Sequence, residues 1–286
     1  MDLSQGDPRP DAVATLSVRV EGVEFRVRAD VARQPFWCGV SAGFWEPHTF
    51  RALRRFLDPG CSLVDIGAWI GPMTLYAGRL ARRVHAIEPD PIAHIELAAN
   101  LAVNPELADR VALHRLCIAP EPGPAKLYAG GMYYGGSSRF GDSMSGILPT
   151  AGDREQPCCQ VDGERIEEFL EGNAIDDCRL IKMDVEGAEY CLIPGRWRRL
   201  SAHAMPTLCV SFHAPAPAQR ETLIGDCLEE LRACYKWIYA ASDRAELNVG
   251  QLLHSVTGWD DESPGSPWLA LERLLGDGVV ASNEAW

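Results

Sequence analysis

Apolar and polar residues alternate from Leu16 to Ala29, and Glu21-Gly22 interrupts the alternation. The apolar positions are Leu16, Val18, Val20, Val23, Phe25 and Val27. A period of two is typical of a half-buried β-strand, since successive side chains point to opposite faces. The pattern therefore predicts a β-hairpin, or two short strands, near the N-terminus.

A second pattern runs from Ser62 to Pro91, and the rest of the chain is organised around it. A short apolar run over residues 63–66 is typical of a buried strand, and a turn containing Gly67 and Gly71 follows. Apolar residues then take helical spacing over residues 73–82, and a second apolar run over 84–87 ends at Glu88. Strand, helix and strand in this order predict a βαβ unit, which builds parallel sheets.

The remaining apolar runs extend this alternation of strands and helices. Helices are predicted to begin at Glu46-Pro47 and at Pro91, and to end near Leu57 and Val103. Further helices are predicted over 164–170 and 219–233, and further strands over 111–119, 179–183, 207–212, 235–240 and 252–256. Residues 130–157 are rich in glycine and lack periodicity, which indicates a loop and a candidate lid. The sequence therefore predicts an α/β fold.

We expect three parts in the chain. Residues 1–58 would form an N-terminal extension, a hairpin and a helix packed on the core. Residues 59–258 would form the cofactor-binding core, and residues 259–286 a C-terminal cap over the sheet.

Composition and charge mainly exclude functions. Hydrophobic residues make up 47% of the 286 positions and charged residues 23%, as in soluble globular proteins. No apolar run reaches membrane-spanning length, and the first residues lack a basic-then-apolar signal, so we expect a cytoplasmic protein without membrane contact. The formal net charge of −13 disfavours nucleic acids, whose phosphates are neutralised by Lys and Arg. The ten cysteines include no C-x-x-C pair and are expected to be buried, reduced thiols.

The βαβ unit carries a candidate cofactor site. Glu88 follows Gly67 by 21 positions, and an acidic residue about that far beyond a glycine turn can accept hydrogen bonds from a ribose diol. Dinucleotide sites have glycine in the middle of this turn, so that backbone can approach a pyrophosphate, but this chain has Trp69 there. The turn therefore favours a nucleoside cofactor without phosphate, such as S-adenosylmethionine. Asp65, near the end of the first strand, could face that cofactor's amino group or sulfonium.

Residues along most of the chain resemble a known family. Residues 180–189, LIKMDVEGAE, resemble the K-x-D-V-E-G-A-E signature of the FkbM-like methyltransferases. Further matches are Phe44-Trp45-Glu46-Pro47, residues 56–60 (FLDPG), residues 86–91 (AIEPDP) and residues 100–104 (NLAVN). The resemblance extends from about Gly43 to His213. It implies a Rossmann-like class I methyltransferase fold with a mostly parallel seven-stranded sheet, and S-adenosyl-L-methionine as cofactor.

The βαβ unit and the resemblance together give a set of candidate cofactor-binding residues. They are Glu46, Asp65, Gly67, Ala68, Trp69, Gly71, Glu88, Pro89, Ser137, Ser138, Asp184 and Glu186. Ser137 and Ser138 are included because relatives often carry Gly-Ser-Ser where this chain has Gly136-Ser137-Ser138.

Two residues at predicted strand ends are candidate catalytic groups. Asp184 and His213 follow their strands directly, and ligands of open α/β sheets bind beyond the carboxyl ends of strands. We predict that His213 acts as general base, because an unperturbed imidazole titrates near pH 6.5, and that Asp184 is the next candidate. The expected acceptor is a hydroxyl of a small molecule, sugar or natural product. The choice of oxygen is implied by the resemblance alone.

Other functions stay open at this point. A nicotinamide-dependent oxidoreductase is disfavoured by Trp69, and a non-catalytic binding protein could keep the same fold. Asp184, Glu186 and Asp142 could hold a divalent cation, but one spacing does not establish this, and no metal is predicted. The sequence specifies neither the acceptor nor the oligomeric state.

Overall fold

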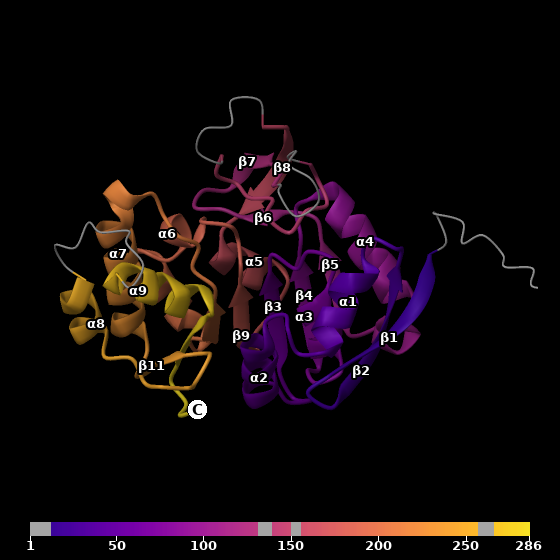
Figure 1. The fold of residues 1–286 in the computed structure, drawn as a ribbon, viewed down its shortest axis with the longest axis horizontal. Helices are drawn as coiled ribbons and strands as arrows, with labels where there is room; N and C mark the ends of the chain where they lie inside the picture. The colour runs from indigo at the N-terminus through magenta and orange to yellow at the C-terminus, as the bar shows by residue number, and fades with distance from the viewer. Residues whose placement is uncertain (1–12, 131–138, 150–155, 257–265) are drawn as a thin grey trace, which may run out of the picture.

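A seven-stranded sheet forms the centre of the computed structural model, which describes residues 13–130, 139–149, 156–256 and 266–286. The strands of this sheet are β3 (Ser62–Ile66), β4 (Arg83–Ile87), β5 (Val111–His114), β9 (Cys178–Met183), β10 (Thr207–Val210), β11 (Trp237–Ala240) and β12 (Val279–Ser282). In space their order is β11-β12-β10-β9-β3-β4-β5, and β12 runs antiparallel to both of its neighbours (Figure 1). The predicted α/β fold with a mostly parallel seven-stranded sheet is therefore confirmed.

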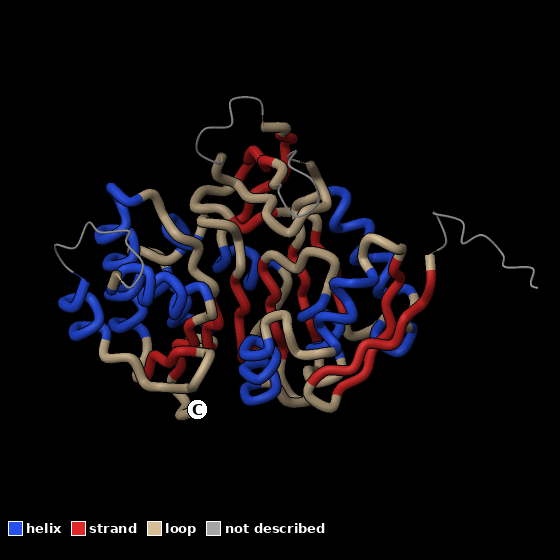
Figure 2. Tube along the Cα trace, in the orientation of Figure 1, coloured by secondary structure: helices blue, strands red, loops and turns tan. Residues whose placement is uncertain are grey.

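Helices cover both faces of the sheet, and each face has its own apolar core (Figure 2). The helices are α1 (Gln34–Ser41), α2 (Pro47–Phe56), α3 (Pro72–Gly78), α4 (Pro91–Ala102), α5 (Ile166–Gly172), α6 (Glu189–Leu192), α7 (Arg220–Cys234), α8 (Val249–Val256) and α9 (Pro267–Gly276). One core includes Phe50 and Tyr76, and the other includes Phe169 and Trp197. All of β3 is buried because both faces of the sheet are covered, and apolar side chains therefore take successive positions, as at Leu63 and Val64, rather than alternate ones. None of the described helices is both long and apolar enough to cross a membrane.

The N-terminal hairpin, β1 (Ala14–Val20) with β2 (Val23–Ala29), is antiparallel as predicted and is held by Asn100 of α4 and by Asn104, which follows that helix. The Asn104 amide accepts a hydrogen bond from the Arg26 N–H at 2.8 Å and donates one to the Arg26 carbonyl at 2.7 Å. The Asn100 amide accepts from the Arg28 N–H at 2.8 Å and donates to the Ile70 carbonyl at 2.9 Å. Because Ile70 belongs to the turn after β3, these amides connect the hairpin to that turn.

Replacing the buried Asn104 with alanine is expected to lower the free energy of unfolding by about 1–3 kcal/mol, because it leaves the part-buried N–H and carbonyl of Arg26 without these partners. Urea unfolding followed by circular dichroism measures the change. Thr222→Ala, on the exposed side of α7, is the control and should stay within about 0.5 kcal/mol of wild type. Equal stabilities for the two variants would show that the amide contacts do not hold the hairpin.

A three-stranded sheet, ordered β6 (Cys117–Ile118), β8 (Cys158–Glu164), β7 (Gly123–Tyr128), lies beyond the central strands (Figure 1). The prediction of one strand over residues 111–119 was wrong. The chain leaves the central sheet after His114, where β5 is the edge strand, and pairs with β8 from Cys117 onward. The small sheet brings Cys117, Ile118 and Leu127 into the wall of a cavity at the ends of the central strands.

The structure also corrects the predicted C-terminal end of the sheet. Residues 252–256, predicted as the last strand, belong to helix α8, because Val249, Leu252 and Leu253 have helical spacing and pack on the core. The last strand is β12, which is inserted between β10 and β11 and comes from the segment predicted to cap the sheet. The division of the chain after residues 58 and 258 stays a prediction.

Candidate functional site

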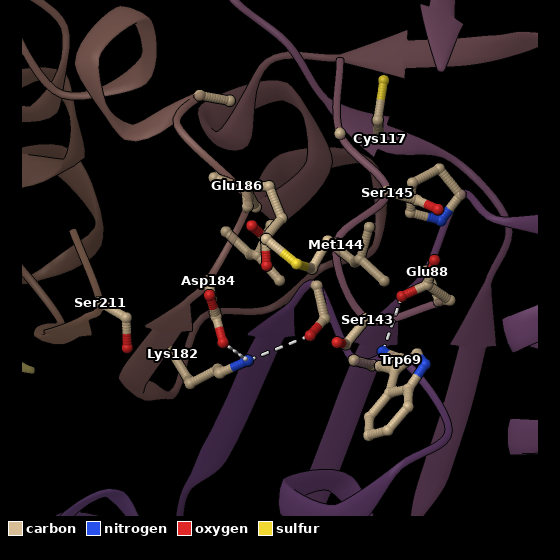
Figure 3. A pocket seen from close by; sticks show the side chains of 18 of the residues that line it. Trp69, Glu88, Cys117, Ser143, Met144, Ser145, Lys182, Asp184, Glu186 and Ser211 are labelled. Atoms are coloured by element: carbon tan, nitrogen blue, oxygen red, sulfur yellow. Dashed lines mark hydrogen bonds and ion pairs between the residues drawn. The ribbon is translucent and has the colours of Figure 1, made fainter. Parts of the chain in front are cut away.

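A cavity of about 290 Å³ opens at the carboxyl ends of β3, β4, β9 and β10 (Figure 3). Its lining includes the predicted site residues Glu46, Gly67, Ala68, Trp69, Glu88, Pro89, Asp184, Glu186 and His213. Asp65 and Gly71 are not part of the lining, and Ser137 and Ser138 lie outside the described residues. Acids that follow two different strands, Glu88 after β4 and Asp184 after β9, therefore share one cavity.

The turn after β3 depends on glycine at two close contacts. Gly67 has a φ of +78°, and a Cβ there would lie 1.9 Å from the carbonyl oxygen of Asp184. Gly71 has a φ of +95°, and a Cβ there would lie 2.4 Å from the side chain of Leu97. Gly67 thus lets the end of β3 approach the end of β9, whereas Gly71 lets the start of α3 pack against α4.

Glu88 holds this turn from the neighbouring strand. Its carboxylate accepts one hydrogen bond from the Trp69 N–H at 2.6 Å and one from the Asp90 N–H at 2.7 Å. The side chain is 6% exposed, and burial raises the pKa of Glu88 to about 8, although the two N–H groups and Lys182 act in the opposite direction. Each carboxylate oxygen has a further lone pair, so Glu88 can still accept hydrogen bonds from a ribose diol.

The raised pKa of Glu88 predicts that stability depends on pH. Because the folded-state pKa lies above the ordinary 4.5, the contribution of Glu88 is full below about pH 4.5 and is lost as the pH rises through about 8. Glu88→Gln cannot ionise, so we expect a smaller loss of stability between pH 5 and pH 8.5, measured by urea unfolding at each pH. Glu229→Gln, at an exposed position of α7, should keep the wild-type dependence. An unchanged dependence in Glu88→Gln would contradict the prediction.

Trp69 links the turn to the N-terminal extension and to a loop that lines the cavity. Its indole N–H donates to the Gly141 carbonyl at 3.1 Å, and its ring lies 4.7 Å from the Phe36 ring. The Arg33 guanidinium lies over the indole, 5.1 Å from its centroid. The side chain therefore packs on neighbouring elements and positions the loop residues after Gly141.

Lys182 of β9 joins several acids at the bottom of the cavity, as Figure 3 shows for its ion pair with Asp184. Its Nζ donates to the Gly67 carbonyl at 3.0 Å and lies 3.5 Å from Asp184 Oδ2 and 3.7 Å from Asp65 Oδ1. Burial lowers the pKa of Lys182, but Asp184 and Asp65 outweigh this effect and hold the pKa above its usual value. Asp65 is fully buried and accepts a hydrogen bond from the Thr74 hydroxyl at 2.6 Å. Asp65 therefore holds Lys182 in place from below the cavity.

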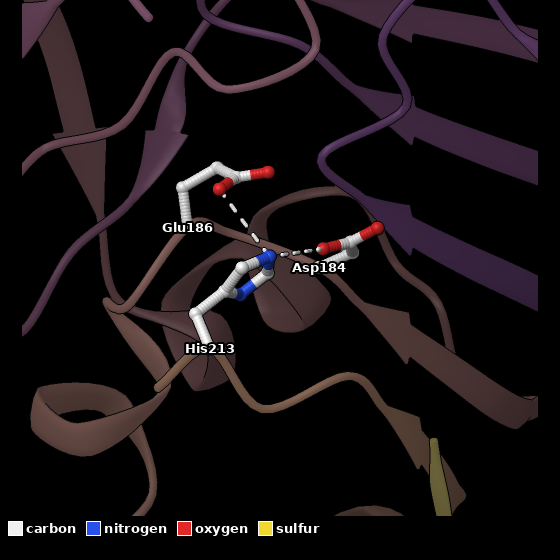
Figure 4. A group of neighbouring side chains, drawn as sticks. All are labelled: Asp184, Glu186 and His213. Atoms are coloured by element: carbon white, nitrogen blue, oxygen red, sulfur yellow. Dashed lines mark ion pairs between the residues drawn. The ribbon is translucent and has the colours of Figure 1, made fainter. Parts of the chain in front are cut away.

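Three carboxylates surround His213, and Figure 4 shows two of them, Asp184 and Glu186. Its Nε2 lies 3.5 Å from Asp184 Oδ1 and 3.3 Å from Glu186 Oε2, and its Nδ1 lies 3.0 Å from Glu189 Oε1. Burial lowers the pKa of His213, but hydrogen bonds with Glu186 and Glu189 outweigh burial and raise the pKa to about 11. Glu189 also accepts a hydrogen bond from the Val185 N–H at 3.2 Å, so it stabilises the turn before α6 as well.

The FkbM methyltransferase domain model matches residues 65–236, which is more than half of the chain. The chain belongs to the FkbM methyltransferase family. This membership confirms the predicted resemblance, and the FkbM methyltransferases use S-adenosylmethionine as cofactor. A search of curated proteins finds no match.

Solved structures that resemble this FkbM-family chain cover it in part. Methyltransferase FkbM from Methylobacillus flagellatus KT is 19% identical, with a TM-score of 0.39 over 72% of this chain and 49% of that one. A Streptococcus mutans protein in complex with SAH is 24% identical, with a TM-score of 0.22 over 24% of this chain and 38% of that one. TYW2 from M. jannaschii in complex with AdoMet is 22% identical, with a TM-score of 0.25 over 35% and 42%. The chain thus spans about half the length of the first and less of the other two.

The residues of this FkbM-family cavity fit S-adenosylmethionine by their chemistry. Glu88 offers a buried acceptor to a ribose, and Ile66, Ile87 and Ile118 supply apolar wall. Burial raises the pKa of Glu46 to about 7, Asp184 adds to this effect, and Glu46 Oε2 has no hydrogen-bond partner among the described residues. A cavity whose acidic side chains outnumber its basic ones suits a cofactor with a positive sulfur.

Several residues and contacts of the site in this FkbM-family chain were not predicted from the sequence. Lys182 and Asp184 are two positions apart on a strand, so they share a face, and this spacing could have placed Lys182 beside the acids. The contact between Glu189 and His213 joins residues 24 positions apart and has no local signal. Ser143, Met144 and Ser145 line the cavity from the stretch that was predicted as a loop and candidate lid, and Asp142, which was considered as a cation ligand, lines it beside them.

Proposed function

We propose that this FkbM-family domain is an S-adenosylmethionine-dependent methyltransferase that methylates a hydroxyl of a small molecule, sugar or natural product. The observation that carries the proposal is the shared cavity, in which Glu88 lies on one side and Asp184 and Glu186, the partners of His213, lie on the other (Figure 3). A donor held at the first end and an acceptor held at the second would meet between them. The oxygen acceptor is inferred from the family resemblance.

The cofactor half would be formed by the turn after β3 and by Glu88. Bound S-adenosylmethionine supplies a methyl group that its positive sulfur already activates. Glu88 would hold the ribose, and the backbone at Gly67 and Ala68 would lie along the cofactor, since both residues line the cavity. The chain's main contribution is then alignment of donor and acceptor, which can lower the barrier by roughly 7–11 kcal/mol.

The acceptor half would be formed by Asp184, Glu186 and His213. A hydroxyl acceptor must lose its proton, and help from a positioned base is typically worth ~10²–10⁴-fold in rate. His213 has carboxylates at both ring nitrogens, so it must first give up a proton before it can act as the base that we predicted. Asp184 also lines the cavity, which supports its role as the next candidate. Asp184 and Glu186 as cofactor ligands stay predictions, because both also contact His213.

Two further functions have less support. A nicotinamide cofactor needs close approach of backbone to its pyrophosphate, and Trp69 occupies the position where such sites have glycine. A non-catalytic binding protein would have no need of Asp184 and His213. Loss of methylation in the double variant Asp184→Asn, His213→Ala, with retained cofactor binding, would separate catalysis from binding.

Calorimetry with S-adenosylmethionine, followed by a screen for adenosylhomocysteine release across sugars, polyketides and peptides, tests the proposal. We expect saturable binding that Glu88→Ala weakens and that Glu229→Ala, at an exposed position of α7, leaves unchanged. No binding by the wild-type protein, with Glu88→Ala indistinguishable from it, would remove the basis of the proposal.

A further inference from the structure

We propose that Asp184, Glu186 and His213 form a binding site for a divalent cation of the Mn²⁺ or Mg²⁺ type. Each residue offers one ligand atom, and the three atoms all lie within 4.8 Å of one another (Figure 4). The imidazole Nε2 is 3.5 Å from Asp184 Oδ1 and 3.3 Å from Glu186 Oε2, so all three side chains converge on one point. Mg²⁺ takes ligands at about 2.0–2.1 Å, and small side-chain movements would bring these three atoms to that distance.

Glu189 gives independent support, because it occupies the position of an outer partner of a metal-bound histidine. Its side chain is fully buried, Oε1 lies 3.0 Å from His213 Nδ1, and Oε2 has no hydrogen-bond partner among the described residues. Histidines that bind metals almost always donate their other ring N–H to a carboxylate, carbonyl or water. A proton kept on Nδ1 by Glu189 would leave the Nε2 lone pair for the cation.

The balance of charge around His213 also favours a cation. Asp184, Glu186 and Glu189 contact one imidazole, and the nearby Lys182 shares its charge between Asp184 and the buried Asp65. A divalent cation would compensate the remaining negative charge. Among the described residues, Asp184, Glu186 and His213 bring three such ligand atoms close together.

Two carboxylate oxygens and one imidazole nitrogen suit an octahedral divalent ion, which would keep about three further positions for water or substrate. All three side chains line the cavity, so these positions would face its acceptor half. An acceptor hydroxyl bound there would become more acidic, because a cation stabilises the oxygen anion. This role rests on the proposed function, whereas the cation site itself does not. With the cation bound, Asp184 and His213 would serve as its ligands instead of as bases, and the proton of the more acidic hydroxyl would pass to solvent water.

Manganese titration of the purified, chelator-treated protein tests the site without cofactor or acceptor. The electron paramagnetic resonance signal of free Mn²⁺ should fall as one equivalent binds. Glu186→Gln and His213→Ala should each abolish this binding, and Glu189→Gln, which acts through His213, should weaken it by roughly 10–100-fold. Asp142→Asn removes an acid that lines the same cavity outside the group, and it should keep the wild-type affinity.

Two results would overturn the site: no saturable Mn²⁺ binding by the wild-type protein, or wild-type affinity in both Glu186→Gln and His213→Ala. Circular dichroism identifies a variant that does not fold, and Glu186→Gln, which changes one atom of a partly exposed side chain, keeps the test decisive. S-adenosylmethionine calorimetry on the same samples separates the two proposals. Mn²⁺ binding without S-adenosylmethionine binding would contradict the proposed methyltransferase function but support the cation site. Turnover that is equal with and without Mn²⁺ would contradict the proposed role of the cation in acidifying the acceptor.

Discussion

Gly67→Ala is expected to lower turnover by roughly 10²-fold or more and to destabilise the protein by about 2–5 kcal/mol. The added methyl group would lie 1.9 Å from the carbonyl oxygen of Asp184, which is backbone and cannot move aside alone. The ends of β3 and β9 would have to separate, and Glu88 and Asp184 would move relative to each other. Adenosylhomocysteine release measures turnover, cofactor calorimetry measures binding, and urea unfolding measures stability.

Gly22→Ala is a matched control for this substitution. Gly22 has a φ of +79°, almost the same as the +78° of Gly67, but no atom lies within 4 Å of a Cβ placed there. It should therefore carry the backbone strain, of order 1–3 kcal/mol, without the clash, and should bind cofactor normally. If Gly67→Ala bound cofactor as well as Gly22→Ala, the close approach of β3 and β9 would not matter for the site.

Local patterns predicted the centre of the fold correctly. The βαβ unit was recognised because a buried run, a glycine turn and a helical run follow one another without interruption, and β3, α3 and β4 appear in that order. The predicted helix over 73–82 was too long, since α3 ends at Gly78. A Cβ at Gly78 would lie 3.2 Å from Val111 and 3.3 Å from Leu107, so the chain packs tightly at that point. Periodicity carries no information about such a contact.

Pairing between distant segments could not be predicted from local patterns. β12 has four residues and takes its place between β10 and β11 through contacts with strands about 40 and 70 positions earlier. β6 has two residues and pairs with β8 across the glycine-rich stretch. Strands this short have no period of their own, and their partners determine them.

The acids of the candidate site that follow strands were predicted from the sequence. The contacts between side chains of different elements were not. Asp184 was identified because ligands bind at the carboxyl ends of parallel strands, and Glu88 because it follows the glycine turn at the spacing of a ribose-binding acid. Asp65 precedes the end of β3, and its side chain turns to Lys182 and Thr74 rather than into the cavity. The partners of His213 come from the turn before α6 and its first residue, so only the folded chain brings them together.

Lys182→Met is expected to lower the free energy of unfolding by about 3–5 kcal/mol at pH 7, because it leaves the buried Asp65 without its cation. Burial already raises the pKa of Asp65, while Lys182 and the Thr74 hydroxyl lower it, so loss of Lys182 would raise the pKa further. A raised carboxyl pKa means stability that is present at low pH and lost as the pH rises. The difference in the free energy of unfolding between wild type and Lys182→Met should therefore be smaller at pH 5 than at pH 7, as measured by urea unfolding.

Two further variants test the cause of this loss. Lys126→Met, at an exposed position of β7, controls for the change of side chain and should be close to wild type. Adding Asp65→Asn to Lys182→Met should restore part of the stability, since the uncompensated charge is then absent. Lys182 would act by packing if Lys182→Met lost equal stability at both pH values and Asp65→Asn did not restore any of it. In that case the acids at the strand ends would hold their positions without a central cation.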